Sequence, residues 1–382
     1  MKKLLSVVLA SATLFAFAGC SKSDEGAGFG SNESYTSSNT EFFIGSTGPL
    51  TGDASSYGIS VQQGAQLAVD EINATGGVNG VMLKFDMKDD KAATAEAAPG
   101  YDALFEAGMN VSIGSVTSGS CESFASKAAE DNLFFITPSA SAANVIEGRK
   151  NGFRICFGDP DQGTLAAEDL TGRYTKIGAI YDTSDPYSAG VFEAFDDKMK
   201  ELGVEYVVKT FDAENKKDFS TQVEAMADCE VIFLPIYYTE AGLIARAATA
   251  KGITAELFGC DGFDGIVDQV DSNVTNVIKY ITPFNVNSKD EKIAAFVAAY
   301  QEKYNALPDQ FAADGYDAIY TIAKAIEKAG VTDPTISASD LCDKIVPVIT
   351  SSDFSVEGVT GTMTWDESGA SSKAPQIVVL GE

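Results

Sequence analysis

Hydroxyl side chains follow two of the predicted strands, at the point where each strand ends. Ser118 comes just after the strand predicted over residues 111–114, and Ser139 and Ser141 come just after the strand over 133–137. In open α/β sheets ligands bind beyond the carboxyl ends of the strands, and small hydroxyl residues leading into a helix offer hydroxyl and backbone N–H donors to an anion. A carboxylate is therefore the group that this pattern would bind.

Each of these serines has a second explanation. Ser, Thr and Asp commonly cap helix N-termini, and for one serine taken alone the cap is the better explanation. Two such clusters together favour binding instead. Asp261 also follows a strand, and with Gly262 it could simply form an Asp-Gly turn. The spacing of Asp261, Asp264 and Gly265 does not match a calcium-binding EF-hand loop, so we expect no metal there.

The chain contains no histidine among its 382 residues, which removes much catalytic chemistry. Ser-His-Asp and Cys-His nucleophile systems, HExxH zinc sites and imidazole acid–base relays are excluded. Binding should therefore be nearly independent of pH around neutrality. The formal net charge of −28 argues against nucleic acid as a partner and disfavours a net anionic ligand.

Other reactive groups give weaker signals. The adjacent acids Asp89-Asp90 and Asp196-Asp197 could support acid–base hydrolysis, but adjacent side chains point in different directions, so a hydrolase is a remote alternative. The cysteines after residue 20 are too far apart for a CxxC motif or a zinc knuckle. We expect mostly buried thiols, with a single long-range disulfide left open, and no cofactor.

The first forty residues are typical of a targeting signal followed by a tether. A basic start, residues 1–3, precedes an apolar run over 4–17 that is too short to cross a bilayer, which takes about 20 helical residues. The small residues directly before Cys20 resemble a bacterial lipobox, in which the cysteine is lipidated; an ordinary signal peptide is the alternative. We therefore predict a signal peptide over 1–19 and a lipidated flexible tether over 20–40.

From residue 41 strands alternate with helices, which indicates βαβ units and an α/β fold with parallel sheets covered by helices. Short apolar runs predict strands over 42–45, 83–87, 111–114, 133–137, 176–181, 205–211, 231–236 and 256–259. Apolar positions on one face predict a first helix through Val61, Ala65, Ala68, Val69 and Ile72. Further helices are expected over 94–106, 122–131, 187–202, 219–227, 241–250, 290–304, 315–329 and 339–346.

The alternation restarts after residues 153–155, so we expect two lobes, each with its own sheet. The helix-rich region that follows suggests that the chain returns to complete the first lobe, so that three crossings form the hinge. The end of the chain, 361–365 and 376–380, is typical of a hairpin. The predicted lobes are 41–157 plus 283–359 for lobe I and 158–282 plus 360–382 for lobe II.

Short motifs in a fixed order then resemble a known family. They are 44–52 (IGSTGPLTG), 57–58 (YG), 68–73 (AVDEIN), 114–118 (GSVTS), 136–141 (ITPSAS), 153–154 (FR), 315–318 (GYDA) and 361–366 (GTMTWD). This series is similar to the leucine/isoleucine/valine-binding proteins of ABC importers, which have the type I periplasmic-binding fold. The resemblance covers roughly residues 41–380.

The resemblance implies roles for the polar candidates. Ser118 would bind the α-carboxylate of an amino acid through its side chain and neighbouring N–H groups. Ser139 would offer its backbone carbonyl to the ammonium group and Ser141 its hydroxyl, while Asp261 would pair with the ammonium group. These groups can satisfy a buried zwitterion, in which each unpaired polar group costs about 1–3 kcal/mol, without any cationic side chain.

The resemblance also implies an aromatic lining. Tyr57 and Phe311 match contact positions in the first lobe, and Tyr187 and Tyr237 match positions in the second lobe that close over the ligand. Packing in the core or at the lip of the cleft is the alternative for all four.

We therefore predict a lipid-anchored, extracytoplasmic substrate-binding protein of an ABC importer. It would be a monomer that closes like a hinged clamp on an apolar or branched-chain amino acid and presents both lobes to a membrane permease. A sensory binding module of the same fold is the main alternative.

Overall fold

The computed structural model describes residues 39–380. The predicted signal peptide, the lipidation site Cys20 and almost all of the predicted tether lie outside the described residues.

The first sheet is parallel and has the strand order β2-β1-β3-β4-β5. Its strands β1 and β3 are buried along their whole length, as expected of strands covered on both faces. The strands are β1 (Phe42–Gly48), β2 (Leu83–Asp89), β3 (Val111–Ser115), β4 (Phe135–Thr137) and β5 (Gly152–Arg154).

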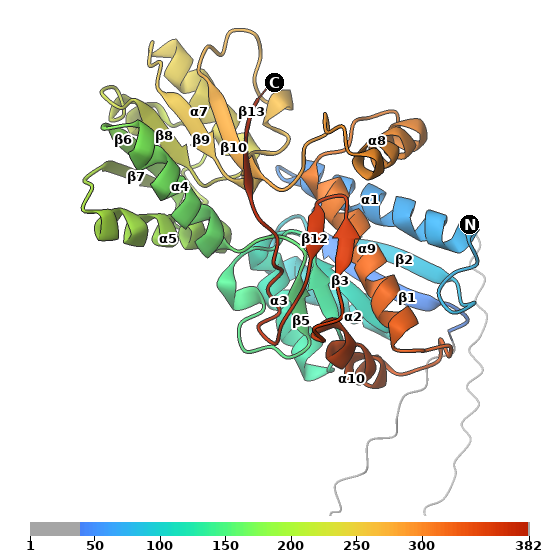
Figure 1. Cartoon of the computed structure of the whole chain (residues 1–382). Helices are drawn as coiled ribbons and strands as arrows, with labels where there is room; N and C mark the ends of the chain where they lie inside the picture. The colour runs from blue at the N-terminus through green and yellow to red at the C-terminus, as the bar shows by residue number, and fades with distance from the viewer. Residues whose placement is uncertain (1–38, 381–382) are drawn as a thin grey trace, which may run out of the picture. The chain divides into compact units, whose positions relative to one another are not determined.

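The second sheet has the order β13-β10-β9-β8-β6-β7 and is parallel except for β13, which runs antiparallel beside β10 (Figure 1). Two mostly parallel sheets confirm the predicted fold class. The strands are β6 (Ile177–Asp182), β7 (Val207–Phe211), β8 (Val231–Leu234), β9 (Glu256–Gly259), β10 (Ile278–Thr282) and β13 (Gln376–Val379).

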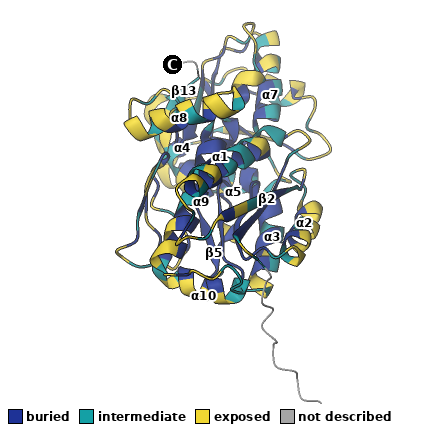
Figure 2. Cartoon of the chain, turned by 90° about the vertical axis from the view of Figure 1, so that its right-hand side faces the viewer, coloured by how far each residue is buried: buried dark blue, intermediate teal, exposed yellow. Residues whose placement is uncertain are grey.

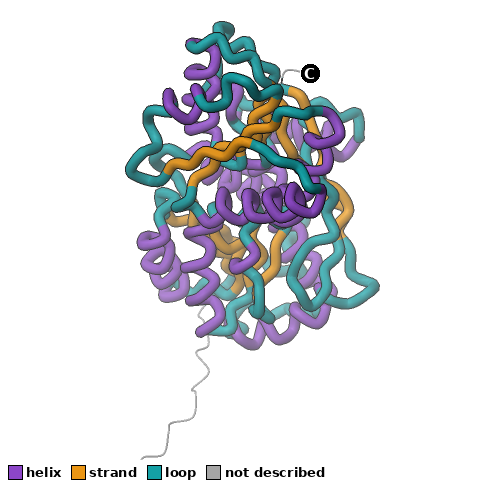
Figure 3. The backbone as a smooth tube through the Cα atoms, turned by 90° about the vertical axis from the view of Figure 1, so that its left-hand side faces the viewer, coloured by secondary structure: helices purple, strands orange, loops and turns teal. Residues whose placement is uncertain are grey.

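Helices surround both groups of strands (Figure 3), and they turn their exposed faces outward while the strands between them are buried (Figure 2). The helices are α1 (Ser55–Ala74), α2 (Thr94–Glu106), α3 (Ser118–Glu130), α4 (Asp159–Arg173), α5 (Pro186–Leu202), α6 (Ser220–Glu224), α7 (Tyr238–Ala250), α8 (Glu291–Tyr304), α9 (Gln310–Lys328) and α10 (Ala338–Ile349). Three short 3₁₀ turns are η1 (Ala143–Val145), η2 (Asp261–Phe263) and η3 (Ile266–Asp268).

Helices α1 and α9 cross at a distance that only glycine allows. A Cβ atom at Gly64 would lie 1.9 Å from the carbonyl oxygen of Ala312, and one at Gly315 would lie 2.6 Å from that of Val61. Both contacts are with backbone, which cannot move aside as a side chain could. The close crossing holds the N-terminal half of α9, including Phe311, against α1.

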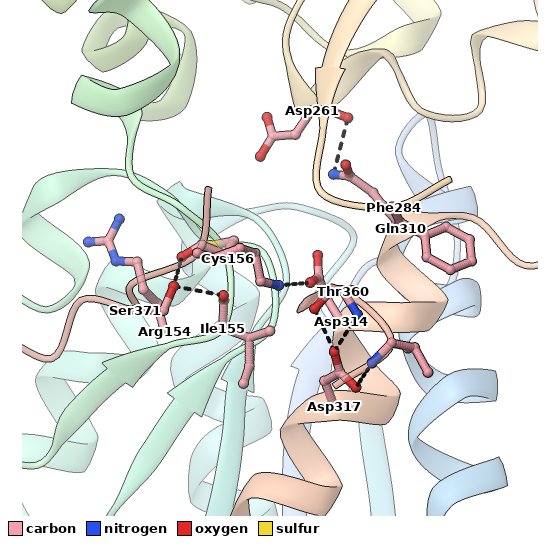
Figure 4. A network of polar contacts seen from close by, with 12 residues as sticks. Arg154, Ile155, Cys156, Asp261, Phe284, Gln310, Asp314, Asp317, Thr360 and Ser371 are labelled. Atoms are coloured by element: carbon pink, nitrogen blue, oxygen red, sulfur yellow. Dashed lines mark hydrogen bonds and ion pairs between the residues drawn. The ribbon is translucent and has the colours of Figure 1, made fainter. Parts of the chain in front are cut away.

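The chain passes between the two sheets three times: after β5, after β10 and between β12 (Gly361–Met363) and β13. Polar contacts join the first and third passes (Figure 4). The Ser371 hydroxyl bonds to the carbonyl oxygens of Ile155 and Cys156, both at 3.0 Å, and the indole N–H of Trp365 donates to the carbonyl of Arg154 at 2.8 Å.

A buried ion pair anchors the third pass. The Nζ of Lys373 lies 2.7 Å from Oδ1 of Asp314 on α9, and both side chains are only 1% exposed. Burial raises the pKa of Asp314 to about 7 despite the lysine. Removing one member of such a pair would leave an uncompensated charge in the interior.

One sequence prediction about this region was wrong. The predicted hairpin of 361–365 with 376–380 does not form, because β12 pairs with β11 (Val356–Gly358) and β13 joins the second sheet. The carboxylate of Asp317 on α9 explains why β12 pairs with β11. It accepts hydrogen bonds from Val359 and Thr360 in the tight β11–β12 turn.

Helix α4 was not predicted, because its sequence is rich in Asp, Gln, Gly and Thr and shows little apolar periodicity. The five cysteines in the described part of the chain are all free, so the disulfide left open by the sequence does not form there.

Replacing Lys373 with Met should lower the free energy of unfolding by about 3 kcal/mol, because Asp314 would remain buried without its cation. Urea unfolding at pH 7.5, followed by the fluorescence of the single tryptophan, Trp365, measures this. Lys200→Met is the control, since Lys200 is 66% exposed and pairs only at the surface, where the expected loss is below about 1 kcal/mol. Equal losses for the two variants would contradict the prediction.

Candidate functional site

Seven of the eight predicted site residues line one small space between the two sheets, with a cavity volume of about 10 Å³. They come from both halves of the fold: α1 and the β3–α3 and β4–η1 connections on one side, and α5, the β8–α7 connection and η2 on the other, with α9 beside them. The seven are Tyr57, Ser118, Ser139, Tyr187, Tyr237, Asp261 and Phe311, and Val116, Thr117 and Gly262 complete the lining.

Ser118 is the first residue of α3, so it stands at a helix N-terminus. Its Oγ accepts hydrogen bonds from the backbone N–H groups of Ser141 and Ala142, both at 3.2 Å. Because both bonds use Oγ as an acceptor, the hydroxyl hydrogen is available for an anion. The first N–H groups of a helix lack intrahelical partners and carry partial positive charge, so this end of the site can hold a carboxylate.

Ser139 and Ser141 differ in their surroundings. The Ser139 hydroxyl donates to the carbonyl of Val116 at 2.7 Å, which fixes the loop after β4 against the loop after β3. Ser141 is buried but does not line the small cavity. Its carbonyl accepts a hydrogen bond from the guanidinium of Arg154, and its hydroxyl has no hydrogen-bond partner among the described residues.

Asp261 is the first residue of η2 and is 4% exposed. Its backbone N–H donates to Oε1 of Gln162 at 3.0 Å, and its carbonyl accepts from Nε2 of Gln310 at 3.4 Å (Figure 4). Burial raises the pKa of its carboxyl to about 6, although hydrogen bonds from Tyr187 and Gln162 favour the ionised form. No ion pair to Asp261 occurs in the described structure.

A second carboxylate, Asp159, lies close enough to influence the site and was missed by the sequence analysis. It is the first residue of α4, it is 1% exposed, and neither of its oxygens has a hydrogen-bond partner among the described residues. Burial raises its pKa well above the usual range, the nearby Ser141 side chain acts to lower it, and the charge of Asp261 acts to raise it. Asp159 and Asp261 therefore influence each other electrostatically.

The signal that could have found Asp159 is local. Gly158-Asp159-Pro160 places a proline in the first turn of a helix, a position where proline is favoured, and it begins four residues after Arg154.

The aromatic residues form one contiguous cluster around this space, in which the edge-on contact of Tyr57 with Tyr237 joins two stacked pairs. The ring of Tyr57 stacks on Phe311 with centroids 4.2 Å apart, and Tyr187 lies parallel to Tyr237 at 5.2 Å. The Tyr57 hydroxyl donates to the carbonyl of Gly262 at 2.5 Å and accepts from the N–H of Tyr238 at 3.1 Å. These two hydrogen bonds connect α1 to η2 and to the start of α7, which belong to the half of the fold that contains the second sheet.

The site thus has one group that suits an anion and one that suits a cation, and aromatic rings line the same space. The nearest guanidinium, that of Arg154, is already bonded to the carbonyl groups of Ser141 and Ala142. Within residues 39–380 no group of three or more His, Cys, Asp or Glu side chains could hold a metal ion.

Comparison with known proteins identifies this architecture. A model of the periplasmic binding protein family matches residues 41–367. The chain is 27% identical over 348 residues to the leucine-, isoleucine-, valine-, threonine- and alanine-binding protein of Pseudomonas aeruginosa, with 90% of each chain covered.

Solved structures agree with this. A leucine-binding protein from Thermotoga maritima matches with a TM-score of 0.77 and 28% identity, covering 88% of this chain and 94% of that one. A branched-chain amino acid transporter substrate-binding protein from Streptococcus pneumoniae, solved with isoleucine, matches with a TM-score of 0.75 and 29% identity, covering 89% and 99%.

The fold is therefore the type I periplasmic-binding fold, as the motifs predicted. The chain belongs to the periplasmic binding protein family, whose members are substrate-binding proteins rather than enzymes and act outside the cytoplasm. None of the helices within residues 39–380 is both long enough and apolar enough to cross a membrane.

The raised pKa of Asp261 predicts a pH dependence on the acid side. A ligand ammonium group favours the ionised carboxylate, so binding below the pKa requires loss of a proton from Asp261. Affinity should be flat above about pH 7, where the sequence also predicted flatness, and should fall about tenfold per pH unit below about pH 6. Isothermal titration calorimetry from pH 4.5 to 8 measures this, with circular dichroism at each pH to show that the fold persists. An affinity that stays constant down to pH 4.5 would contradict it.

Proposed function

We propose that this protein is an extracytoplasmic substrate-binding protein of an ABC importer and that it binds an amino acid with an apolar or branched side chain between its two lobes. The observation that carries the proposal is that a helix N-terminus at Ser118 and the buried carboxylate of Asp261 line the same small space. An α-amino acid carries the complementary carboxylate and ammonium groups on a single carbon.

The aromatic lining supports an apolar side chain. Tyr57, Phe311 and Tyr237 present ring surface beside the two charged ends, and Val116 adds an aliphatic group. Burial of an apolar side chain against such groups is favourable by about 1.5–3 kcal/mol. The relatives named for leucine, isoleucine and valine are consistent with this choice.

Hinge closure is part of the proposal. The hydrogen bonds of Tyr57 to Gly262 and Tyr238 join the two sides across the site, and a cavity of about 10 Å³ cannot admit an amino acid without movement. The three chain passes near Arg154, Phe284 and Lys373 are the segments about which the lobes would open and close.

The partners follow from the same role. We propose that the closed form docks onto a membrane permease, that Cys20 carries a lipid anchor to the membrane, and that the protein acts as a monomer. A sensory protein of the same fold would bind the same ligand and signal to a different partner, so transport of the ligand by the reconstituted importer separates the two roles.

The adjacent acid pairs do not favour a hydrolase. Asp89 accepts hydrogen bonds from Leu50 and Thr51, and Asp90 accepts one from Ser115 at 2.7 Å. Asp196 bonds to Tyr206 and pairs with Lys200. Each of these carboxylates thus has a structural contact of its own.

A thermal-shift screen of the purified protein against all amino acids and common amides tests the proposal. Leucine, isoleucine or valine should raise the unfolding temperature, since a ligand present at 100 times its Kd stabilises the native state by about 2.7 kcal/mol. Chromatography of the ligand after incubation shows whether it is turned over. Turnover, or the absence of a shift with every amino acid, would overturn the proposal.

Two substitutions test the residue assignments. Asp261→Ala should abolish binding because the ammonium group loses its carboxylate, whereas the exposed Asp268→Ala in η3 should bind normally. Ser118→Ala should weaken binding by about 1.5–3 kcal/mol, the loss of one hydrogen bond to a charged group, and Ser126→Ala on the exposed face of α3 is its control. Calorimetry showing unchanged affinity for Asp261→Ala would refute the assignment.

A further inference from the structure

A second and much larger cavity, of about 420 Å³, adjoins the site described above. The two spaces share the walls formed by Thr117 and Tyr237. The larger cavity is bounded by the β1–α1 and β2–α2 connections on one side and by the start of α5, the segment after β7 and the start of α7 on the other. Its volume is within the range of small-molecule sites, about 300–1,000 Å³.

The charges on the wall of this cavity are unequal. Four carboxylates line it, from Asp53, Asp182, Asp185 and Glu240, against two ammonium groups, from Lys91 and Lys216.

Both lysines already have partners. Lys216 lies 3.2 Å from Glu240 and 3.7 Å from Asp53, and Lys91 lies 3.6 Å from Glu96. Asp182 and Asp185 have no Lys or Arg nitrogen within 4.0 Å in the described part of the chain. The excess negative charge is therefore located at the end of β6 and at the N-cap of α5.

Local hydrogen bonds hold these two carboxylates in place without neutralising them. Oδ1 of Asp182 accepts from the N–H and the hydroxyl of Ser184, and Oδ1 of Asp185 accepts from the N–H of Ser188 as the N-cap of α5. Burial raises the pKa of Asp185 to about 6, which is the cost of an ionised carboxylate without a cation beside it.

Thr117 lines both spaces. Its side chain is 5% exposed, and its Oγ1 has no hydrogen-bond partner among the described residues. A buried polar atom without a partner costs about 1–3 kcal/mol, so a polar ligand atom at this position would relieve the cost. The purely apolar side chain of leucine offers no such atom.

We propose that the larger cavity is a side-chain subsite for basic amino acids, in which a ligand whose α-carbon groups lie at Ser118 and Asp261 extends past Thr117 and Tyr237 and places an amine or guanidinium group beside Asp182 and Asp185. This inference rests on the proposed function and extends the ligand range beyond apolar side chains. An acidic side chain is disfavoured, because Lys91 and Lys216 are already paired and two further carboxylates would face it.

Calorimetric titration of the purified chain with arginine, lysine, citrulline, glutamate and leucine tests the subsite. Arginine and lysine should bind, and citrulline, which has the length of arginine without its charge, should bind at least about tenfold more weakly. Asp182→Asn and Asp185→Asn should each weaken arginine binding about ten- to hundredfold, the effect of losing one hydrogen bond between charged groups, and should leave leucine binding within about twofold.

Both variants keep the local structure, because asparagine retains the Oδ1 acceptor and is as good an N-cap as aspartate. Asp197→Asn is the matched control, since Asp197 lies on the same helix but outside the cavity. If each of the three variants unfolds at the same temperature as the unsubstituted protein, the fold is intact.

The outcomes separate the two proposals. Leucine binding without arginine or lysine binding overturns the subsite and leaves the proposed function standing, as does arginine binding that is insensitive to both Asn variants. Tighter binding of glutamate than of arginine also overturns the subsite. Failure of every amino acid to bind overturns the proposed function and the subsite with it.

Discussion

Burial of carboxylates with few cations to balance them is the constraint on which this structure depends. Asp159, Asp261 and Asp314 are each at most 4% exposed, and only Asp314 has a lysine partner. An isolated buried charge is costly. The pKa of a buried carboxyl is therefore raised unless a cation compensates its charge. Under the proposed function, the same imbalance would favour a positively charged group of the ligand.

The topology brings together the two polar ends of the candidate site, the helix N-terminus at Ser118 and the carboxylate of Asp261. Parallel strands in both sheets end at the centre of the molecule, so the helix start at Ser118 and the 3₁₀ turn at Asp261 meet although they are far apart in sequence. The glycine-mediated crossing of α1 and α9 holds Tyr57 and Phe311 stacked on each other beside them. Under the proposed function, stability and recognition would rely on the same contacts.

The sequence predicted most of this arrangement because buried parallel strands and their following loops have strong local patterns. Ser118, Ser139 and Asp261 all follow such strands. Asp159 was missed because the polar helix α4 has little periodicity to reveal it. The partner of β13 could not be predicted either, since the sequence of a four-residue strand does not show which sheet edge it joins. The role of Lys373 could not be predicted because its ion-pair partner, Asp314, is distant in the sequence.

The position of β13 has a consequence for folding. This strand, residues Gln376–Val379, forms the outer edge of the second sheet, whereas the other strands of that sheet come from residues 177–282. Until β13 pairs, the edge of β10 lacks its neighbour, and until Lys373 reaches α9, Asp314 lacks its cation. Completion of the second sheet is therefore coupled to packing of the third chain pass against α9, so neither half of the fold is completed independently of the other.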